Sequence, residues 1–257
     1  MFSIVIVTWK NYGCLKMTVD SIKKNSFFDN EIVVHVQEDC SLSKKYLEDL
    51  GIAYTFSDNN IGLSSAANLA SSLATKEILC FFDDDMYALP LWDRSLLSMK
   101  KRLPLKSTAC SIMIENNGVI DIDCGKTLAS FDEDKLLSVF SAGLPLVEGR
   151  YNNSSCPFLV DRDSYFEAGG YDEDLPNVGA ELGLAKNLWD IGFRDIGVEC
   201  VGSLVYHLQS TTLNRLNRIE LAKNRDTVFM KKHNHSSDEF RIMMKKGKSH
   251  QWNKIEK

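Results

Sequence analysis

Long apolar runs are absent from this sequence: no stretch reaches the roughly 18 residues that a membrane-spanning helix requires. The apolar start, Met1–Thr8, is too short for a signal peptide and lacks basic residues before it. We therefore expect a cytoplasmic protein. Its 257 residues, of which 44% are hydrophobic and 25% charged, suffice for one large soluble domain or for one domain with a small extension.

Cysteine pairs with metal-binding spacing are also missing. The seven cysteines are scattered and include no Cys-x-x-Cys motif. An odd number without such spacing favours reduced, mostly buried thiols over a disulfide framework or a zinc site. The residues are Cys14, Cys40, Cys80, Cys110, Cys124, Cys156 and Cys200.

The net charge of −5 is unevenly distributed along the chain. Residues 212–257 contain twelve Lys and Arg against five Asp and Glu, which leaves a net charge of −12 on residues 1–211. This acidic part argues against broad binding of nucleic acid. We expect residues 212–257 to form a basic helical extension.

Apolar, β-branched segments alternate with segments of helical periodicity through the first ninety residues. This alternation is typical of an α/β protein with a doubly wound sheet. The expected strands are 2–8, 31–36, 53–56 and 78–82, and the expected helices are 15–24, 46–50 and 64–75. Farther along, the expected helices are 91–102, 164–168 and 180–191, and the expected strands are 108–114, 158–160 and 201–206. Residues 115–155 look like short antiparallel strands or loops.

Three consecutive carboxylates, Asp83, Asp84 and Asp85, follow the apolar strand at 78–82. Adjacent negative charges repel one another, so a fold that collects them usually supplies a cation. Polar residues also follow the first two strands, as Thr8–Trp9 and Glu38–Asp39. Because ligands bind beyond the carboxyl ends of strands in open α/β sheets, we expect the three groups to share one edge and to bind a divalent metal with an anionic ligand.

Five segments follow one another along the chain: Ser3–Asn11, Asn60-Ile61-Gly62, Asn68, Asp83–Asp85 and the Gly-Gly-Tyr-Asp-Glu segment Gly169–Glu173. In this order they resemble the family 2 glycosyltransferases with the GT-A fold. The resemblance covers about residues 2–208. It implies a GT-A domain at 1–211, with a nucleotide-binding half at 1–90 and an acceptor-binding half at 91–211.

The resemblance also implies a nucleotide-diphosphate sugar donor, for which a UDP-sugar is favoured, and a saccharide or lipid-linked acceptor. It implies Mn²⁺ or Mg²⁺, which prefers hard oxygen ligands and stabilises a leaving diphosphate. The metal ligands that it suggests are Asp83, Asp85 and His207, with Asp83 otherwise contacting the ribose or a metal-bound water. The donor-binding residues that it suggests are Thr8, Trp9, Glu38, Asp39, Asn60, Gly62, Asn68, Asp83 and Asp84, although no individual contact is assigned to Asp84.

The sequence departs from the family pattern around the residue that binds the base. The usual Val-Asp-Asp-Gly-Ser is replaced by Val-Gln-Glu-Asp-Cys-Ser at 36–41, so either Glu38 or Asp39 could accept the imide N–H of uracil. Ala66-Ala67 also occupies the place of an Arg that the family often has in this helix.

In inverting members an acid at the start of a late helix removes the proton of the acceptor hydroxyl. Aligning Leu188–Phe193 with the end of that helix places Glu181 on one of three acidic positions, with Ala180 and Gly183 on the others. Glu181 is therefore the candidate general base of an inverting enzyme. If Glu181 only stabilises the helix N-terminus, the chain is retaining or catalytically impaired.

Two alternatives remain open. A sugar nucleotidyltransferase needs a glycine-rich basic loop after its first strand, and Trp9–Gly13 supplies only one Gly and one Lys. A binding module for nucleotide sugars or glycans without turnover would fit the reduced acidic motif around Glu181. The basic extension, with Phe and Met among its lysines, fits a peripheral contact with an anionic membrane at the inner face, and equally a solvated helix or a dimer contact.

Overall fold

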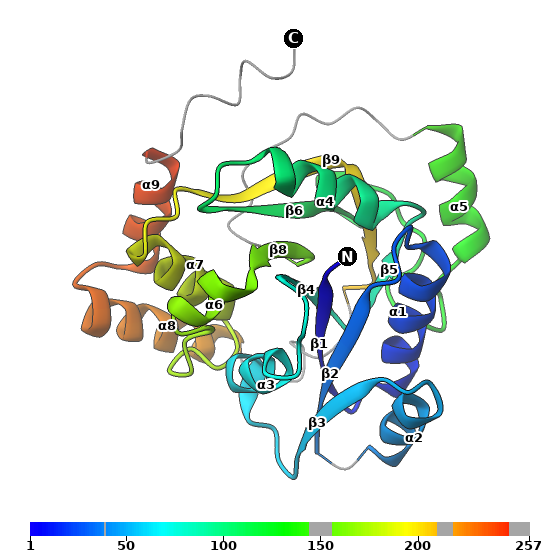
Figure 1. Ribbon diagram of the computed structural model, residues 1–257, viewed down its shortest axis with the longest axis horizontal. Helices are drawn as coiled ribbons and strands as arrows, with labels where there is room; N and C mark the ends of the chain where they lie inside the picture. Colours follow the sequence, from blue (N-terminus) through cyan, green and yellow to red (C-terminus); the bar gives the residue numbers. More distant parts are fainter. Residues whose placement is uncertain (39, 144–155, 210–217, 247–257) are drawn as a thin grey trace.

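The computed structural model describes residues 1–38, 40–143, 156–209 and 218–246 of the chain. In its first part, strands and helices alternate as the sequence predicts (Figure 1). These elements are β1 (Ser3–Trp9), α1 (Tyr12–Asn25), β2 (Glu31–Gln37), α2 (Ser41–Asp49), β3 (Ala53–Ser57), α3 (Gly62–Ser71) and β4 (Ile78–Asp83).

The second part is less regular. Its elements are β5 (Met86–Ala88), α4 (Trp92–Arg102), β6 (Ser107–Glu115), β7 (Ile120–Asp121), α5 (Glu133–Ala142), β8 (Phe158–Asp161), α6 (Arg162–Glu167), α7 (Ala180–Asp190), β9 (Asp195–His207), α8 (Arg218–His233) and α9 (Ser237–Lys246). The expectation of antiparallel strands or loops at 115–155 was wrong for residues 120–121 and 133–142, whereas residues 122–132 form bends and turns as expected. The two exceptions are the parallel strand β7 and the helix α5, whose N-terminus is capped by the Asp132 side chain.

The described strands form one nine-stranded mixed sheet in the order β3-β2-β1-β4-β8-β6-β9-β5, with β7 paired to β6 (Figure 1). Strands β1, β2, β3 and β4 are parallel to one another. Strand β8 runs antiparallel to both β4 and β6, and β9 runs parallel to β6. The carboxyl ends of β6 and β9 therefore point the same way as those of β1, β2 and β4.

Burial explains why the first strands read as continuous apolar runs. Phe2, Ile4 and Ile6 are fully buried, as expected for central parallel strands covered on both faces. Helix α3 packs against β1 and β2 through alanines, and Ala66 and Ala70 are fully buried. Small side chains let this helix lie close to the strand ends. The architecture is the mixed, helix-flanked α/β sheet that the sequence predicts.

Helices α8 and α9 lie beside α6 and α7 on the left of Figure 1, whereas α1, α2 and α5 lie on the right. Three side chains of these helices belong to the main hydrophobic core, and each is at most 2% exposed. They are Phe229 of α8 and Phe240 and Met244 of α9. The ring of Phe240 packs edge-on against Trp189 of α7. Helical structure is therefore confirmed for part of the basic segment, and these helices share the core of the domain. The division of the chain at residue 211 remains a prediction.

All seven cysteines are free thiols, and six of them are buried, as expected. Among the described residues, no helix combines the length and apolarity that crossing a bilayer demands.

A glycine turn joins α6 to α7 and is held by Asn68 of α3. The Asn68 side-chain oxygen accepts hydrogen bonds from the Tyr165 hydroxyl at 2.5 Å and the Tyr171 N–H at 2.9 Å. Gly169 and Gly170 both have left-handed backbone conformations, with φ of +85° and +71°. A Cβ on Gly170 would lie 2.5 Å from this same Asn68 oxygen, whereas a Cβ on Gly169 would meet nothing within 4 Å.

These two glycines provide a matched pair for measuring what the close approach to Asn68 contributes. Gly169→Ala should lower the free energy of unfolding by about 1 kcal/mol, since only backbone strain is added. Gly170→Ala should lower it by about 3 kcal/mol, because the new methyl group also displaces Asn68. Urea denaturation followed by circular dichroism measures both. Equal losses in the two variants would contradict a packing role for the Asn68 contact.

Candidate active site

The carboxyl ends of five strands converge on one edge of the sheet. Asp83 at the end of β4 pairs with Val7 of β1, one residue before Thr8. On the other half of the sheet, the residues before Glu115 in β6 and His207 in β9 pair with each other. The expectation that the ends of β1, β2 and β4 share one edge is confirmed, and β6 and β9 bring two further side chains to it.

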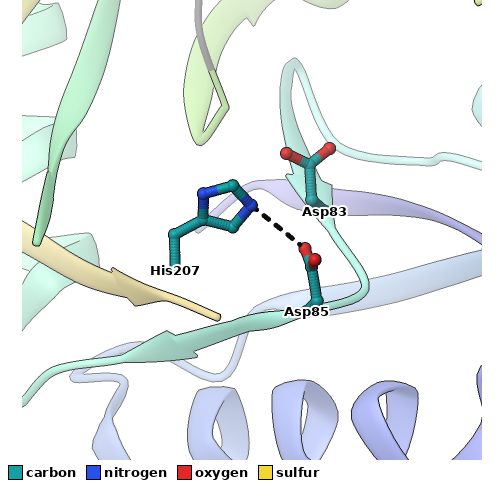
Figure 2. Close-up of side chains that lie close together, drawn as sticks. All are labelled: Asp83, Asp85 and His207. Carbon is teal, nitrogen blue, oxygen red and sulfur yellow. Dashed lines mark ion pairs between the residues drawn. The ribbon is translucent and has the colours of Figure 1, made fainter. Parts of the chain in front are cut away.

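Asp83, Asp85 and His207 form a compact cluster at this edge (Figure 2). Each offers one ligand atom, and the three atoms lie within 4.8 Å of one another. Asp85 occupies the turn between β4 and β5, and the next residue, Met86, pairs with His207 across the β5–β9 ladder. The His207 Nε2 atom lies 3.5 Å from Asp85 Oδ1. The three side chains suggested as metal ligands are thus brought together.

Glu115 orients His207. Its Oε2 lies 2.8 Å from His207 Nδ1, so the imidazole donates its Nδ1–H to this carboxylate and presents Nε2 to the aspartates. A carboxylate behind a histidine is a common arrangement at metal sites, where it fixes the tautomer and raises the basicity of the ligand. Sequence reasoning missed Glu115, although it ends a strand just as Asp83 does.

The charges of the cluster depend on one another. Burial and the neighbouring Asp85 raise the pKa of Asp83 to about 6. Burial alone would lower the pKa of His207, but hydrogen bonds to Asp85 and Glu115 outweigh it and raise that pKa to about 10. The protonated His207 side chain is thus the cation that Asp85 and Glu115 hold when no metal is bound. Two carboxylates and an imidazole within this distance also suit Mn²⁺ or Mg²⁺, so the donor set fits the metal that the sequence implies.

Asp84, for which the sequence gives no individual contact, joins the turn after β4 to the end of β1 by hydrogen bonds. Its Oδ2 accepts a hydrogen bond from the Thr8 hydroxyl at 2.6 Å, and its Oδ1 accepts one from the Asn11 side-chain amide at 3.2 Å. Burial, followed by repulsion from Asp85, raises the pKa of Asp84. These bonds tie the end of β1 to the acidic turn. Donor binding by Thr8 and Asp84 stays a prediction.

The residues expected near the nucleotide base surround the end of β2. Glu38 has a left-handed backbone with φ of 60°, and its carboxylate forms an ion pair with Lys10, which lowers its pKa. Trp9 is partly buried beside Lys10, whose ammonium lies 6.0 Å from the centre of the indole ring. Asp39, the other candidate, lies outside the described residues.

Asn60 and Gly62 shape the start of α3. The Asn60 side-chain oxygen accepts a hydrogen bond from the Gly62 N–H at 2.9 Å. Gly62 has a φ of +84°, and a Cβ there would lie 2.7 Å from the carbonyl oxygen of Pro176. This close contact requires glycine and joins α3 to the segment before α7. For Asn68, the contacts described above likewise hold the 169–173 segment, so its donor contact stays a prediction.

Glu181 occupies the first turn of α7, where the helix begins after Gly179. Burial, and then the negative charge of Asp83, raise the pKa of Glu181 to about 7. The Glu181 side chain therefore lies within electrostatic reach of Asp83. A carboxylate with a pKa near neutrality exchanges protons readily at physiological pH.

The geometry agrees with a comparison of the sequence with known families. Residues 3–126 match the family described as glycosyl transferase family 2. This part of the chain is similar to that family. It comprises the strands β1 to β4 and the acidic turn, and reaches beyond β6, so Glu115 lies within the matched region while Glu181 and His207 follow it.

Solved glycosyltransferase structures share the GT-A fold of this chain. GalNAc-T7 with UDP, GalNAc and Mn²⁺ superposes with a TM-score of 0.61 at 17% identity, covering 98% of this chain and 56% of that one. S. aureus TarS 1–349 with UDP gives 0.58 at 14% identity, covering 94% and 69%. Glucosyl-3-phosphoglycerate synthase from Mycobacterium tuberculosis with Mn²⁺, UDP and glucosyl-3-phosphoglycerate gives 0.57 at 16%, covering 88% and 76%.

At these identities the likeness establishes the fold. The chain spans little more than half of the GalNAc-T7 structure and 41% of the longer S. aureus TarS structure. No curated protein matches it in sequence.

Metal binding tests the role of Glu115 directly. Glu115→Gln should weaken Mn²⁺ binding about tenfold, because the amide no longer fixes and polarises His207 as the carboxylate does. His207→Ala should weaken it further by removing a ligand. Titration of Mn²⁺, followed by electron paramagnetic resonance of the free ion in the presence of UDP, measures both.

Glu167→Gln is the matched control, because Glu167 is an exposed glutamate at the end of α6. Unchanged Mn²⁺ affinity in Glu115→Gln would show that the carboxylate does not act on the metal through His207.

Proposed function

We propose that the chain is an inverting glycosyltransferase that moves a sugar from a UDP-sugar to a hydroxyl group of a glycan or other acceptor, with Mn²⁺ or Mg²⁺. The observation that carries the proposal is the convergence of Asp83, Asp85 and the Glu115–His207 pair at one sheet edge, within electrostatic reach of Glu181. The family match supports the reaction class, and the UDP and Mn²⁺ in the similar structures support the donor class and the metal.

Asp83, Asp85 and His207 would hold the metal. When bound, a divalent ion neutralises the charge that develops on the leaving diphosphate. The protein side of this site is prepared in advance: Glu115 fixes the His207 ring, and the hydrogen bonds from Thr8 and Asn11 to Asp84 fix the acidic turn. Preorganised charge of this kind avoids rearrangement during the reaction.

On the nucleotide side, Glu38 at the end of β2 would accept the imide N–H of uracil, with Asp39 as the other candidate. The ion pair with Lys10 lowers the pKa of Glu38, and an ionised carboxylate accepts a stronger hydrogen bond than a neutral group does. Trp9 would contribute an aromatic face to the same region.

Glu181 would act as the general base. Its carboxylate would take the proton of the acceptor hydroxyl as the oxygen attacks the anomeric carbon from the face opposite the nucleotide. The bond from that carbon to the β-phosphate oxygen breaks, and UDP leaves with the bonding electrons. A pKa near 7 leaves a useful fraction of Glu181 ionised and able to accept a proton at neutral pH.

The acceptor would be a saccharide, free or lipid-linked. Met230, Ile242 and Met243 are exposed on α8 and α9, and exposed lysines accompany them. These side chains support a peripheral contact with anionic lipid at the inner face of a membrane, which would bring a lipid-linked acceptor close.

The proposal predicts that UDP binds in the presence of Mn²⁺ and that at least one UDP-sugar is slowly hydrolysed. In Glu181→Gln, turnover should fall by about 100-fold or more, because the amide cannot take the proton, while UDP affinity stays unchanged. Calorimetry with UDP and chromatography of released UDP measure the two quantities. Glu167→Gln serves again as the control.

If the wild-type protein binds neither UDP nor any UDP-sugar with Mn²⁺, the proposal is wrong. Binding of UDP with no effect of Glu181→Gln on turnover would remove Glu181 from the mechanism and favour a retaining enzyme. Binding of UDP without any turnover would favour the binding module.

Activity should also depend on pH in a way that identifies Glu181. The base works only when ionised, and its pKa is raised to about 7, so kcat should be low in acid and should rise to a plateau as the pH passes through this value. A cation beside Asp83 offsets the repulsion that Asp83 exerts on Glu181, so Mn²⁺ should move the midpoint of this rise to lower pH. A pH series of donor hydrolysis measures it. The residual rate of Glu181→Gln should lack this rise; if it retains the same midpoint, another group titrates.

A further inference from the structure

The segment from Asp172 to Gly179 leads directly into the helix that carries Glu181. On one side it is fastened to α3: the Ser64 hydroxyl donates to the Leu175 carbonyl at 2.6 Å, and the Ser64 N–H donates to the Pro176 carbonyl at 3.2 Å. The segment ends at Gly179, whose left-handed backbone, with φ of 96°, begins α7. The position of Glu181 therefore depends on how this segment is held.

Helix α8 holds the other side of the segment through Lys232. The Lys232 ammonium lies 2.7 Å from Asp172 Oδ1 and 2.6 Å from Asp174 Oδ2. The Asp172 side chain is only 7% exposed, and its Oδ1 also accepts the Asp174 N–H at 3.1 Å. An ion pair with one buried partner is costly to break, because the remaining carboxylate loses its counter-charge.

The segment and α8 both lie close against α7. A Cβ on Gly183, two residues after Glu181, would meet Leu175 Cδ1 at 2.9 Å and Asp172 Cβ at 3.1 Å. A Cβ on Gly179 would meet Arg225 Cγ of α8 at 2.6 Å. Because Gly179 and Gly183 have no side chain, the backbone of α7 approaches both α8 and the 172–179 segment closely. A shift of α8 would therefore be transmitted to the start of α7.

Helix α8 is itself anchored well enough to act as a support. Phe229 is fully buried one turn before Lys232 and packs against Phe240 of α9. Phe240 in turn contacts Trp189 at the end of α7. Lys232 thus extends from a helix that the hydrophobic core holds at both α7 and α9.

We propose that Lys232 is a positioning residue for the general base: by pairing with Asp172 and Asp174 it clamps the 172–179 segment and sets where Glu181 meets the acceptor. The inference rests on the proposed function in so far as Glu181 is the base. A base must be held to within a fraction of an ångström to act, and Lys232 supplies this restraint from α8, outside the region that matches the family.

The test compares Lys232→Gln with Lys232→Arg, which keeps the charge, and with Asp174→Asn, which removes only the exposed partner. Lys101→Gln is the matched control, because Lys101 is an exposed lysine on α4. Hydrogen exchange of the peptide that covers residues 172–185, followed by mass spectrometry, reports how firmly the segment is held without requiring activity. Hydrolysis of the UDP-sugar turned over fastest by the wild type, and calorimetry with UDP and Mn²⁺, report kcat and ligand affinity.

In Lys232→Gln we expect faster exchange at 172–185, unchanged exchange in β1 and β4, and a fall in kcat of about tenfold with UDP affinity unchanged. Asp174→Asn should show a smaller fall, Lys232→Arg should restore most of the rate, and Lys101→Gln should match the wild type. Unchanged exchange in the segment would overturn the inference, as would a loosened segment with full kcat. Faster exchange throughout the protein with UDP affinity lost would also overturn it, since Lys232 would then support the fold as a whole.

A wild type without UDP binding or turnover would refute the proposed function instead, and the exchange data would still decide whether Lys232 holds the segment.

Discussion

Mutual repulsion among the carboxylates after β4 is the constraint that the rest of the site satisfies. Three consecutive aspartates at a half-buried sheet edge are unstable without partners. Asp84 receives two hydrogen bonds from the end of β1, and Asp85 pairs with the His207 imidazolium. Asp83 stays beside them with a raised pKa. Asp84 thus has a structural role, and Asp83 and Asp85 remain together beside His207.

This arrangement depends on the direction in which the second half of the sheet runs. Strand β8 enters antiparallel between β4 and β6, and β6 and β9 then return parallel to the first four strands. Glu115 and His207 therefore arrive at the same edge as Asp83. With β6 and β9 reversed, their carboxyl ends would lie at the opposite edge and the histidine could not reach the aspartates. The antiparallel insertion of β8 is thus a requirement for the cluster of Asp83, Asp85 and His207.

The sequence could predict those features that follow from local patterns. Apolar runs predict the strands, the rule for strand ends predicts a shared edge, and Asp83, Asp85 and His207 are found together as expected. Glu115 follows the same rule but is separated from His207 by 92 residues, so only the topology reveals the pair. The bonds from Asn68 to Tyr171, 103 residues away, are likewise invisible to local reasoning. Helix α5 escaped prediction because Leu136 is its only buried residue, which leaves little apolar periodicity.

The basic C-terminal segment shows why composition alone does not determine what an amphipathic helix contacts. An apolar stripe beside lysines suits a membrane surface and a protein core equally well, because both bury the stripe and leave the charges in water. Phe229, Phe240 and Met244 are buried in the core, so a contact with lipid falls to the exposed Met230, Ile242 and Met243. Since α8 also carries Lys232 to Asp172, the same helix joins an outer surface of the domain to the segment before Glu181. A displacement of α8 would therefore be transmitted to Glu181 through this segment.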